Sequence, residues 1–289
     1  MDLPFLHQRE QPLSDFSTFG IGGPARYFAK AYTCEHLQEM LAFATSTSLR
    51  VIVLGKGSNS LFDDRGFNGL AILNKIDTLK HEQGLFRAGS GYSFARLGGI
   101  SAREGWSGLE FASGIPATVG GAIYMNAGAN GQETADTLIE VGYVTETGEL
   151  VYFKQNQLTF SYRTSSFQQW KGAIVEGLFH LAPSSEAKKV QKGILDYRLK
   201  TQPYGEKSAG CAFRNPLGFS AGQLIENCGL KGEYVGGAYV SSLHANFIVN
   251  KGEAKTQDVL DLMQKIKDQI YYKKGIVLEE EIRYISYDI

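Results

Sequence analysis

The chain has 289 residues, of which 43% are hydrophobic and 20% are charged, as in a globular protein large enough to bury a core without disulfides or metals. Lys and Arg total 29 and Asp and Glu total 30, so the net charge of −1 excludes a bulk electrostatic attraction to nucleic acid or to an anionic membrane. Three widely spaced cysteines, Cys34, Cys211 and Cys228, favour a reducing compartment over a disulfide framework. We therefore expect a cytoplasmic protein, with neither a signal peptide nor a run of about 18 apolar residues that could span a bilayer.

The first half of the chain mixes short strands with amphipathic helices. A glycine turn followed by alternating apolar residues predicts a strand within 18–31, and β-branched runs predict buried strands at 50–55 and 70–74. Thr33 and Ser93 are placed to cap two helices. The apolar face of the first helix consists of Leu37, Met40, Leu41 and Ala44, and that of the second contains Phe94, Leu97 and Ile100.

The second half continues the mixture. A hairpin is predicted at 139–153, turning near Thr147 and Gly148, followed by a strand at 173–183 and a charged helix at 184–203 that links two domains. The remaining predicted elements are a helix at 221–229 ending at a glycine, a strand at 244–250, a helix capped by Thr256 with Val259, Leu260, Met263, Ile266 and Ile270 in one stripe, and a strand at 278–286. Because the order lacks a regular βαβ alternation, it favours an α+β fold over a doubly wound parallel sheet.

Several familiar motifs are absent or carry little weight. The segment Gly55-Lys56-Gly57 follows a strand but lacks the third glycine of the dinucleotide fingerprint, and no Walker pattern occurs. The five histidines are scattered, so we expect no metal site. Residues 218–222, GFSAG, match a nucleophile elbow, and a hydrolase triad of Ser220, Glu226 or Glu233, and His244 has the right chain order. No buried strand precedes Ser220, however, and its simpler role is to cap the following helix.

Two glycine-rich loops carry more information, in a chain with 34 glycines and only 7 prolines. Residues 51–62, VIVLGKGSNSLF, lead a buried strand into Gly-x-Gly-Ser-Asn, and five glycines of residues 113–131 frame Pro116, Met125 and Asn126. Consecutive small residues let backbone N–H groups converge on an anion. Either loop alone is also compatible with an ordinary tight turn, whereas the two together favour a phosphate-bearing cofactor held between them.

Eight ordered blocks across nearly the whole chain resemble the UDP-N-acetylenolpyruvoylglucosamine reductase (UDP-N-acetylmuramate dehydrogenase, MurB) family. They are STFGIGGPA, LGKGSNSL, GIPATVGGAIYMNAGA, FSYRTSSF, SAGCAFRNP, AGQLIENCGLKG, VSSLHANFIVN and LEEEIRY. The resemblance implies a two-part FAD-binding module of the vanillyl-alcohol-oxidase (PCMH) type plus a C-terminal α+β substrate-binding domain, in the family's shorter subtype. The expected divisions are 1–75 and 76–185 for the two FAD-binding subdomains and 186–289 for the substrate domain.

The resemblance also implies the chemistry: reduction of the enolpyruvyl ether of UDP-N-acetylglucosamine enolpyruvate in peptidoglycan precursor synthesis. The cofactor would be noncovalent FAD, with NADPH as co-substrate and a UDP-sugar as substrate, and we expect no nucleic-acid, membrane or obligate protein partner. The implied FAD contacts are Gly55, Lys56, Gly57, Ser58, Asn59, Ser60, Leu61, Gly114, Ile115, Pro116, Val119, Gly120, Gly121, Ala122, Met125 and Asn126.

Three residues match the catalytic positions of the family. Arg163 offers a planar guanidinium to the substrate carboxylate, and Glu281 would polarise that carboxylate beside it, although Glu279 and Glu280 make the register ambiguous. Cys211 occupies the proton-donor position, where serine is frequent in the family; a thiol is a far stronger acid than an alcohol. By family position, the substrate contacts are Tyr162, Asn215 and Arg283.

Three rival functions remain to be weighed. An oxygen-dependent flavin oxidase of a carbohydrate or alcohol could use the same FAD-binding fold, and a non-catalytic flavin-binding protein would keep the glycine loops. The combination of Arg163, Cys211 and Glu281 favours reduction of an anionic alkene over both. The third rival is the Ser220 hydrolase described above.

Overall fold

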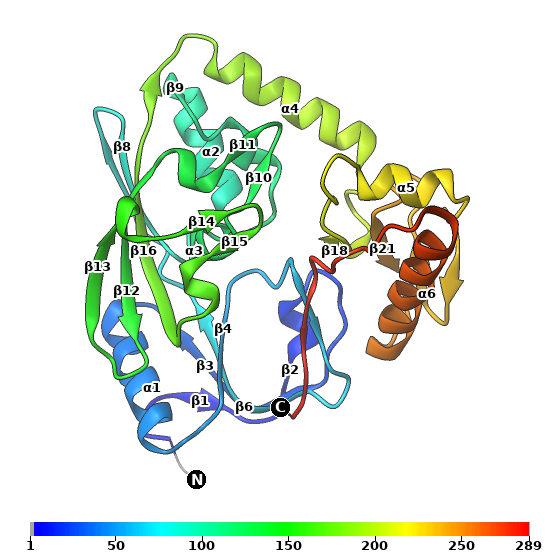
Figure 1. Ribbon diagram of the computed structural model, residues 1–289. Coiled ribbons are helices and arrows are strands. Elements are labelled where there is room, and N and C mark those ends of the chain that lie inside the picture. The colour runs from blue at the N-terminus through cyan, green and yellow to red at the C-terminus, as the bar shows by residue number, and fades with distance from the viewer. Residues whose placement is uncertain (1–2, 289) are drawn as a thin grey trace. The chain divides into compact units, whose positions relative to one another are not determined.

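The computed structural model describes residues 3–288, which fall into two compact units built from interleaved segments (Figure 1). Among the described residues, the first unit contains 3–9, 27–56 and 69–198, and the second contains 10–26, 57–68 and 199–288. The predicted divisions 1–75, 76–185 and 186–289 are contiguous in sequence and stay a prediction. The chain passes between the units after Arg9, within strand β3 (Pro24–Ala31), after Lys56, within strand β6 (Phe67–Asn74) and within helix α4 (Ala187–Thr201).

One sheet of the first unit has the order β1 (His7–Gln8), β3, β6, β4 (Val51–Leu54), and β2 (Gln11–Pro12) also pairs with β3. Strands β4 and β6 run parallel, so the two predicted buried runs at 50–55 and 70–74 lie side by side. Helix α1 (Cys34–Ser46) begins after Thr33, whose side chain accepts a hydrogen bond from the His36 amide. The four residues of its predicted apolar face are buried, which confirms both the helix and its cap.

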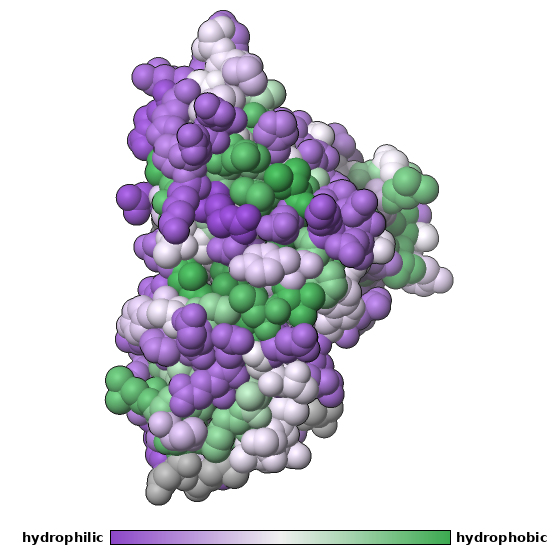
Figure 2. All heavy atoms as spheres, turned by 90° about the vertical axis from the view of Figure 1, so that its left-hand side faces the viewer, coloured by the Kyte–Doolittle hydropathy of each residue, from purple (hydrophilic) through white to green (hydrophobic). Residues whose placement is uncertain are grey.

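The second sheet of the first unit is antiparallel. Its order is β13 (Leu150–Lys154), β12 (Leu138–Thr145), β16 (Gly172–His180), β8 (Leu85–Gly89), β7 (Leu79–Glu82). Helices α2 (Phe94–Arg103) and α3 (Val119–Tyr124) share a buried cluster with one face of this sheet, and α1 packs on β12 and β16 from the other. Figure 2 views the side of β13 and α1, where hydrophilic and hydrophobic side chains alternate.

The second unit is built around a four-stranded sheet with two helices. The strand order is β18 (Lys207–Cys211), β21 (Phe247–Asn250), β20 (Ala238–Val240), β19 (Tyr234–Val235), and the helices are α5 (Ala221–Asn227) and α6 (Thr256–Lys274). Four residues of the predicted α6 stripe are buried, and Leu260 packs against the same core at partial exposure. Helix α5 ends before Gly229, whose φ of +74° matches the predicted glycine end.

Three details of the predicted second half were wrong. The strand expected from 244 begins at Phe247, and the strand expected over 278–286 is only β22 (Arg283–Ile285), which pairs in parallel with β5 (Ser60–Phe62). Thr256 is the first residue of α6 and not its cap: Asp258 accepts the Lys255 amide, and the Thr256 hydroxyl donates to the Phe62 carbonyl. The competing long-range bond to Phe62 explains why the local capping pattern failed.

Short paired strands and 3-10 turns complete the described chain. The strand pairs are β9 (Trp106–Ser107) with β17 (Ala182–Pro183), β10 (Gly128–Ala129) with β11 (Gln132–Glu133), and β14 (Phe160–Ser161) with β15 (Thr164–Ser165). The 3-10 helices are Leu13–Phe16, Glu110–Gly114, Thr134–Asp136, Gln155–Gln157 and Ser166–Gln168. Among residues 3–288, no helix combines the length and apolar character needed to cross a bilayer.

Candidate active site

The first glycine loop leaves strand β4 at a point where side chains do not fit. A Cβ on Gly55 would lie 2.4 Å from the hydroxyl oxygen of Thr118, which caps helix α3 in the second glycine loop. The two loops therefore pack directly on each other in the first unit. Two residues on, Gly57 has a φ of +61°, and a Cβ there would lie 2.0 Å from the Phe16 carbonyl oxygen in the second unit. Glycine is required at both positions.

The two loops differ in their free backbone donors. Within residues 3–288, the amides of the stretch 55–59 donate no hydrogen bond to protein atoms. At the start of α3, by contrast, Val119 donates to the Tyr92 carbonyl (2.9 Å) and Gly120 donates to the Ser90 carbonyl (2.8 Å). A run of unused N–H groups is what an anion-binding loop requires. The first loop therefore offers backbone donors, whereas the α3 loop packs against it with its own amides already bonded.

Other predicted cofactor contacts of the second loop are buried or contact neighbouring protein groups. Ala122 lies in the buried cluster under α3, and the thioether of Met125 lies 3.7 Å from the Gln168 amide nitrogen. Asn126 is fully buried and accepts from the Ala135 amide at 3.1 Å. Ser113, which the sequence analysis did not single out, has a buried hydroxyl with no partner in the described part of the chain. Such an atom is expected where a ligand supplies the missing partner.

Arg163 lies at the tip of a two-residue turn in the first unit. Tyr162 and Arg163 connect strands β14 and β15, and Arg163 has a φ of +56°, which costs a non-glycine residue roughly 1–2 kcal/mol. Two side-chain amides hold the turn: Asn126 donates to the Ser161 carbonyl (3.0 Å) and Gln168 donates to the Arg163 carbonyl (3.0 Å). A strained conformation fixed in this way is typical of functional positions, which supports the predicted role of Arg163.

Cys211 follows a β-bulge in the second unit. Between Ser208 and Cys211, strand β18 advances by three residues while its partner β21 advances by two. Gly210 absorbs the extra residue with a φ of +77°. A bulge of this kind redirects the side chains that follow it. A Cβ on Gly210 would lie 3.8 Å from the Ser58 carbonyl oxygen, so the bulge brings the half-buried thiol residue close to the first glycine loop.

Glu281 is held in the same unit between the loop and the strand of Cys211. Its amide donates to the Ala212 carbonyl at 2.8 Å, and its carbonyl accepts from the side-chain amide of Asn59 at 3.1 Å. Because Ala212 directly follows Cys211, the structure brings the predicted proton donor and the predicted carboxylate onto adjacent backbone. Asn59 connects both to the glycine loop.

The neighbouring glutamates face other partners. Glu279 lies 4.0 Å from Arg214, and Glu280 lies 3.2 Å from Lys267; both glutamates are exposed, whereas Glu281 is half-buried. Surface ion pairs of this kind contribute little to stability. This difference in environment supports Glu281 as the functional member of the three.

Comparison with known proteins identifies the family. Residues 202–285 match the model for the C-terminal domain of UDP-N-acetylenolpyruvoylglucosamine reductase, and residues 25–154 match the model for an FAD binding domain. The chain is 56% identical over 290 residues to the UDP-N-acetylenolpyruvoylglucosamine reductase of Protochlamydia amoebophila, covering 100% of this chain and 97% of the relative. The chain belongs to the UDP-N-acetylenolpyruvoylglucosamine reductase family.

Further relatives agree with this assignment. The reductase of Chlamydia pneumoniae is 45% identical over 288 residues, covering 99% of this chain and 94% of the relative. The crystal structure of UDP-N-acetylenolpyruvylglucosamine reductase from Thermus caldophilus is similar with a TM-score of 0.83 and 35% identity, covering 96% of this chain and 99% of that one. The predicted α+β class, with an FAD-binding module and a C-terminal reductase domain, is therefore confirmed.

Within this reductase-family fold, the predicted substrate contacts lie at differing exposure. Tyr162 is 46% exposed on the Arg163 turn. The side-chain oxygen of Asn215 accepts from the Ala221 amide (2.9 Å) at the start of α5. Arg283 is exposed on β22, and its amide donates to the Asn59 carbonyl (3.0 Å). Nothing in these contacts tests their role toward substrate, which stays a prediction.

The elbow motif has a purely structural arrangement in this family member. Ser220 caps α5 by accepting a hydrogen bond from the Gln223 amide. The two glutamates considered as triad partners, Glu226 and Glu233, form ion pairs with lysines. The capping interpretation of Ser220 is therefore confirmed.

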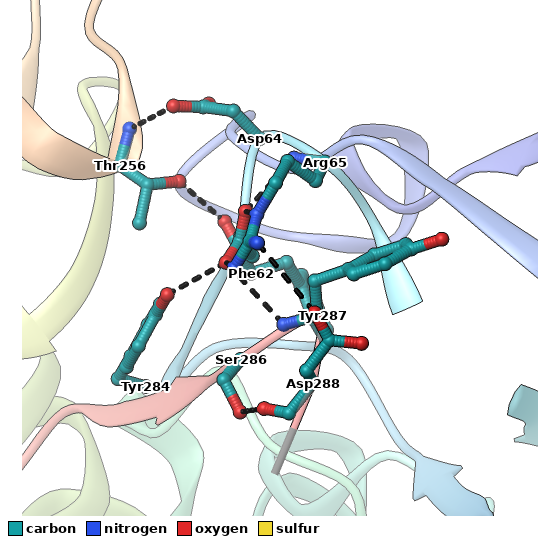
Figure 3. A network of polar contacts seen from close by, with 9 residues as sticks. Phe62, Asp64, Arg65, Thr256, Tyr284, Ser286, Tyr287 and Asp288 are labelled. Carbon is teal, nitrogen blue, oxygen red and sulfur yellow. Dashed lines mark hydrogen bonds and ion pairs between the residues drawn. The ribbon is translucent and has the colours of Figure 1, made fainter. Parts of the chain in front are cut away.

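Sequence reasoning missed a polar cluster around Asp63. Asp63 is only 6% exposed, and its carboxylate accepts hydrogen bonds from the Tyr284 hydroxyl (2.7 Å), the Tyr287 amide (3.3 Å) and the Arg65 side chain (2.8 and 3.0 Å). In Figure 3, the Tyr284 side chain and the Tyr287 backbone of the C-terminal segment approach the segment that runs from Phe62 to Arg65. The Arg65 guanidinium above all holds the pKa of Asp63 well below its usual value, against the opposing effect of burial. The cluster anchors the strand that follows Glu281.

Two further residues support the site of this family member and gave no local signal. The Thr18 hydroxyl donates to the Ser208 carbonyl (2.7 Å), and the Thr18 amide donates to the Gly57 carbonyl (3.4 Å), so Thr18 joins β18 to the glycine loop. Buried Asn246 exchanges two hydrogen bonds with the backbone of Phe213, at 2.8 and 3.0 Å. Both fix the segment that carries Cys211.

Proposed function

We propose that this protein reduces the enolpyruvyl ether of UDP-N-acetylglucosamine enolpyruvate to the lactyl ether of UDP-N-acetylmuramate, with NADPH as the reductant. The observation that carries the proposal is the 56% identity to a named reductase along the entire chain. The adjacency of Cys211, Glu281 and the glycine loop in the second unit supports it. The same set gives no support to an oxygen-dependent oxidase, which has no use for a proton donor beside a carboxylate.

The residues present fit FAD, the cofactor that the matched domain model names. The unused amides of residues 55–59 suit a diphosphate, Gly55 and Gly57 leave the backbone bare, and the unpartnered hydroxyl of Ser113 suits a polar atom of the cofactor. We propose noncovalent binding through the two loops. When bound, FAD supplies the hydride-transfer chemistry.

The protein's own groups would handle charge and the proton. In the reaction, the substrate double bond gains a hydride at the carbon distal to the ether oxygen and a proton at the adjacent carbon. Negative charge develops meanwhile on that adjacent carbon and its carboxylate. We assign the carboxylate to Arg163, whose forked guanidinium stays charged, with Glu281 polarising the same group.

Cys211 would deliver the proton to carbon from its thiol. A thiol is intrinsically a far stronger acid than the serine hydroxyl that is frequent at this position in the family. Tyr162, Asn215 and Arg283 would contact the substrate carboxylate or diphosphate. Because the proposed substrate is a nucleotide sugar and none of the three cysteines forms a disulfide, we place the enzyme in the cytoplasm.

The visible spectrum of the purified protein tests this function directly. We expect a flavin band that is lost when NADPH is added without oxygen and returns when UDP-N-acetylglucosamine enolpyruvate follows. Return of the band with oxygen and a carbohydrate alone, accompanied by peroxide, would establish the oxidase instead. A colourless protein that takes up no added FAD would refute both.

A further inference from the structure

Asn59 occupies an unusual position in the first glycine loop, because its backbone amide is left for a ligand while its side chain bonds to another segment of the protein. Its amide N–H is one of the unused donors of the loop within residues 3–288. Its side-chain amide donates to the Glu281 carbonyl at 3.1 Å, and its own carbonyl accepts from the Arg283 amide at 3.0 Å. Asn59 thus makes a two-point clasp on the residues at either side of Ile282.

This clasp lies between two stretches of strand pairing, an isolated antiparallel bridge of Phe213 with Glu280 and the short parallel ladder of β22 with β5. The parallel ladder between β22 and β5 begins only at Arg283 opposite Ser60, so Glu281 lies outside it. The Glu281 amide donates to the Ala212 carbonyl at 2.8 Å. The backbone of Glu281 is therefore bonded on both sides: its amide to the carbonyl of Ala212, next to Cys211, and its carbonyl to the Asn59 side chain.

We propose that the Asn59 side chain is a positioning residue for Glu281, while its backbone amide faces the cofactor. The proposal deepens the proposed function, since it gives Asn59 the task of fixing the carboxylate that polarises the substrate. Asparagine suits the task because its amide can donate to a carbonyl. Aspartate of the same shape has no N–H to offer and would place a negative charge against that carbonyl.

The consequence follows from geometry. Substitution of Asn59 removes the 3.1 Å hydrogen bond from its side chain to the Glu281 carbonyl and so weakens the hold on that backbone. Displacement of a positioned group by about 1 Å can cost ~10²-fold in rate. The cost should fall on the step in which the substrate is reduced, because Glu281 acts on the substrate. Reduction of FAD by NADPH, which does not use Glu281, should keep its rate.

The experiment compares N59A, the isosteric N59D, E281Q and the control Y284F, each as FAD-loaded enzyme. Tyr284 lies on β22, next to the clasp. Y284F removes the hydrogen bond from the Tyr284 hydroxyl to Asp63 and leaves the clasp intact. In rapid mixing, we expect N59A and N59D to reoxidise with substrate roughly 10–100-fold more slowly, with normal flavin content and normal reduction by NADPH. Y284F should react in both half-reactions at rates close to those of the unaltered chain, because both bonds of the clasp remain.

Hydrogen–deuterium exchange in the absence of substrate gives a readout independent of activity. The peptide covering 279–283 should exchange faster in N59A and N59D and stay unchanged in Y284F. If Asn59 variants lose FAD instead, the side chain serves the cofactor and the inference is wrong. If E281Q is slow while N59A and N59D reoxidise normally, the clasp inference alone fails. If E281Q reoxidises at full rate, the assigned role of Glu281 in the proposed function fails with it.

Discussion

The carboxylate of Asp63 is expected to be a major local source of stability, because it is buried and donor groups from three residues, Arg65, Tyr284 and Tyr287, converge on it. The substitution D63N keeps the shape but removes the charge and turns one acceptor into a donor. The bonds from the Tyr284 hydroxyl and the Tyr287 amide go to a charged acceptor, and each is worth about 1.5 kcal/mol. Arg65 is 62% exposed, so its ion pair adds at most about 1 kcal/mol. We expect D63N to lower the free energy of unfolding by about 3 kcal/mol.

The loss should depend on pH in a defined direction. Because the folded pKa of Asp63 lies below the unfolded value, the carboxylate stabilises the folded state above the unfolded pKa of about 3.9, and this contribution fades as the pH falls further. The free-energy difference between D63N and the unaltered chain should be full at pH 7 and shrink below about pH 4.

Urea unfolding followed by tryptophan fluorescence at pH 7, 5 and 3 measures this difference. Y284F serves as a control that removes one of the two strong bonds and should cost about half as much. A D63N variant that matches the unaltered chain at pH 7 would refute the estimate. A loss that stays constant down to pH 3 would show that packing, and not the charge, is responsible.

Three further outcomes are expected. C211S should retain substantial activity, whereas C211A should lose roughly 10²–10⁴-fold in flavin reoxidation by substrate while NADPH still reduces the flavin; normal reoxidation in C211A would remove the thiol from the mechanism. G57A combines a positive φ with a Cβ placed on the Phe16 carbonyl and should abolish FAD retention, whereas G131A, with a positive φ but open space, should lose only about 1–2 kcal/mol of stability. S220A should lose about 1 kcal/mol of stability through its cap and keep reductase activity; loss of activity with an unchanged unfolding midpoint would reopen the hydrolase interpretation.

Sequence patterns correctly predicted the features that depend on interactions between residues close together in the chain. The cap at Thr33, the apolar face of α1 and the stripe of α6 follow from contacts within one or two helical turns. The glycine-rich sequence of the first loop also indicated that glycine is needed at Gly55 and Gly57. The reason for it was not visible, since Thr118 and Phe16 press on these positions from distant parts of the chain.

The failures share a physical origin in long-range pairing. Asp63 resembles an ordinary turn residue until Tyr284 and Tyr287, more than 200 residues away, converge on it. The predicted strand at 278–286 was too long, because the length of β22 is set by its partner strand β5 and by the clasp of Asn59. Alternation of apolar residues does not record which backbone a strand will meet.

The first glycine loop shows why an apparent defect in a fold points to function. Most backbone amides of a folded protein donate to another protein group, whereas five successive amides from Gly55 to Asn59 donate to no protein atom within residues 3–288. The rest of the loop is held firmly, by Thr18 at Gly57 and by the bonds of Asn59 to the β22 strand segment. A loop that was merely loose would lack such bonds. A rigid loop with spare donors is preorganised for an anion, and because Asn59 also holds Glu281, binding of the diphosphate and placement of the carboxylate depend on the same few residues.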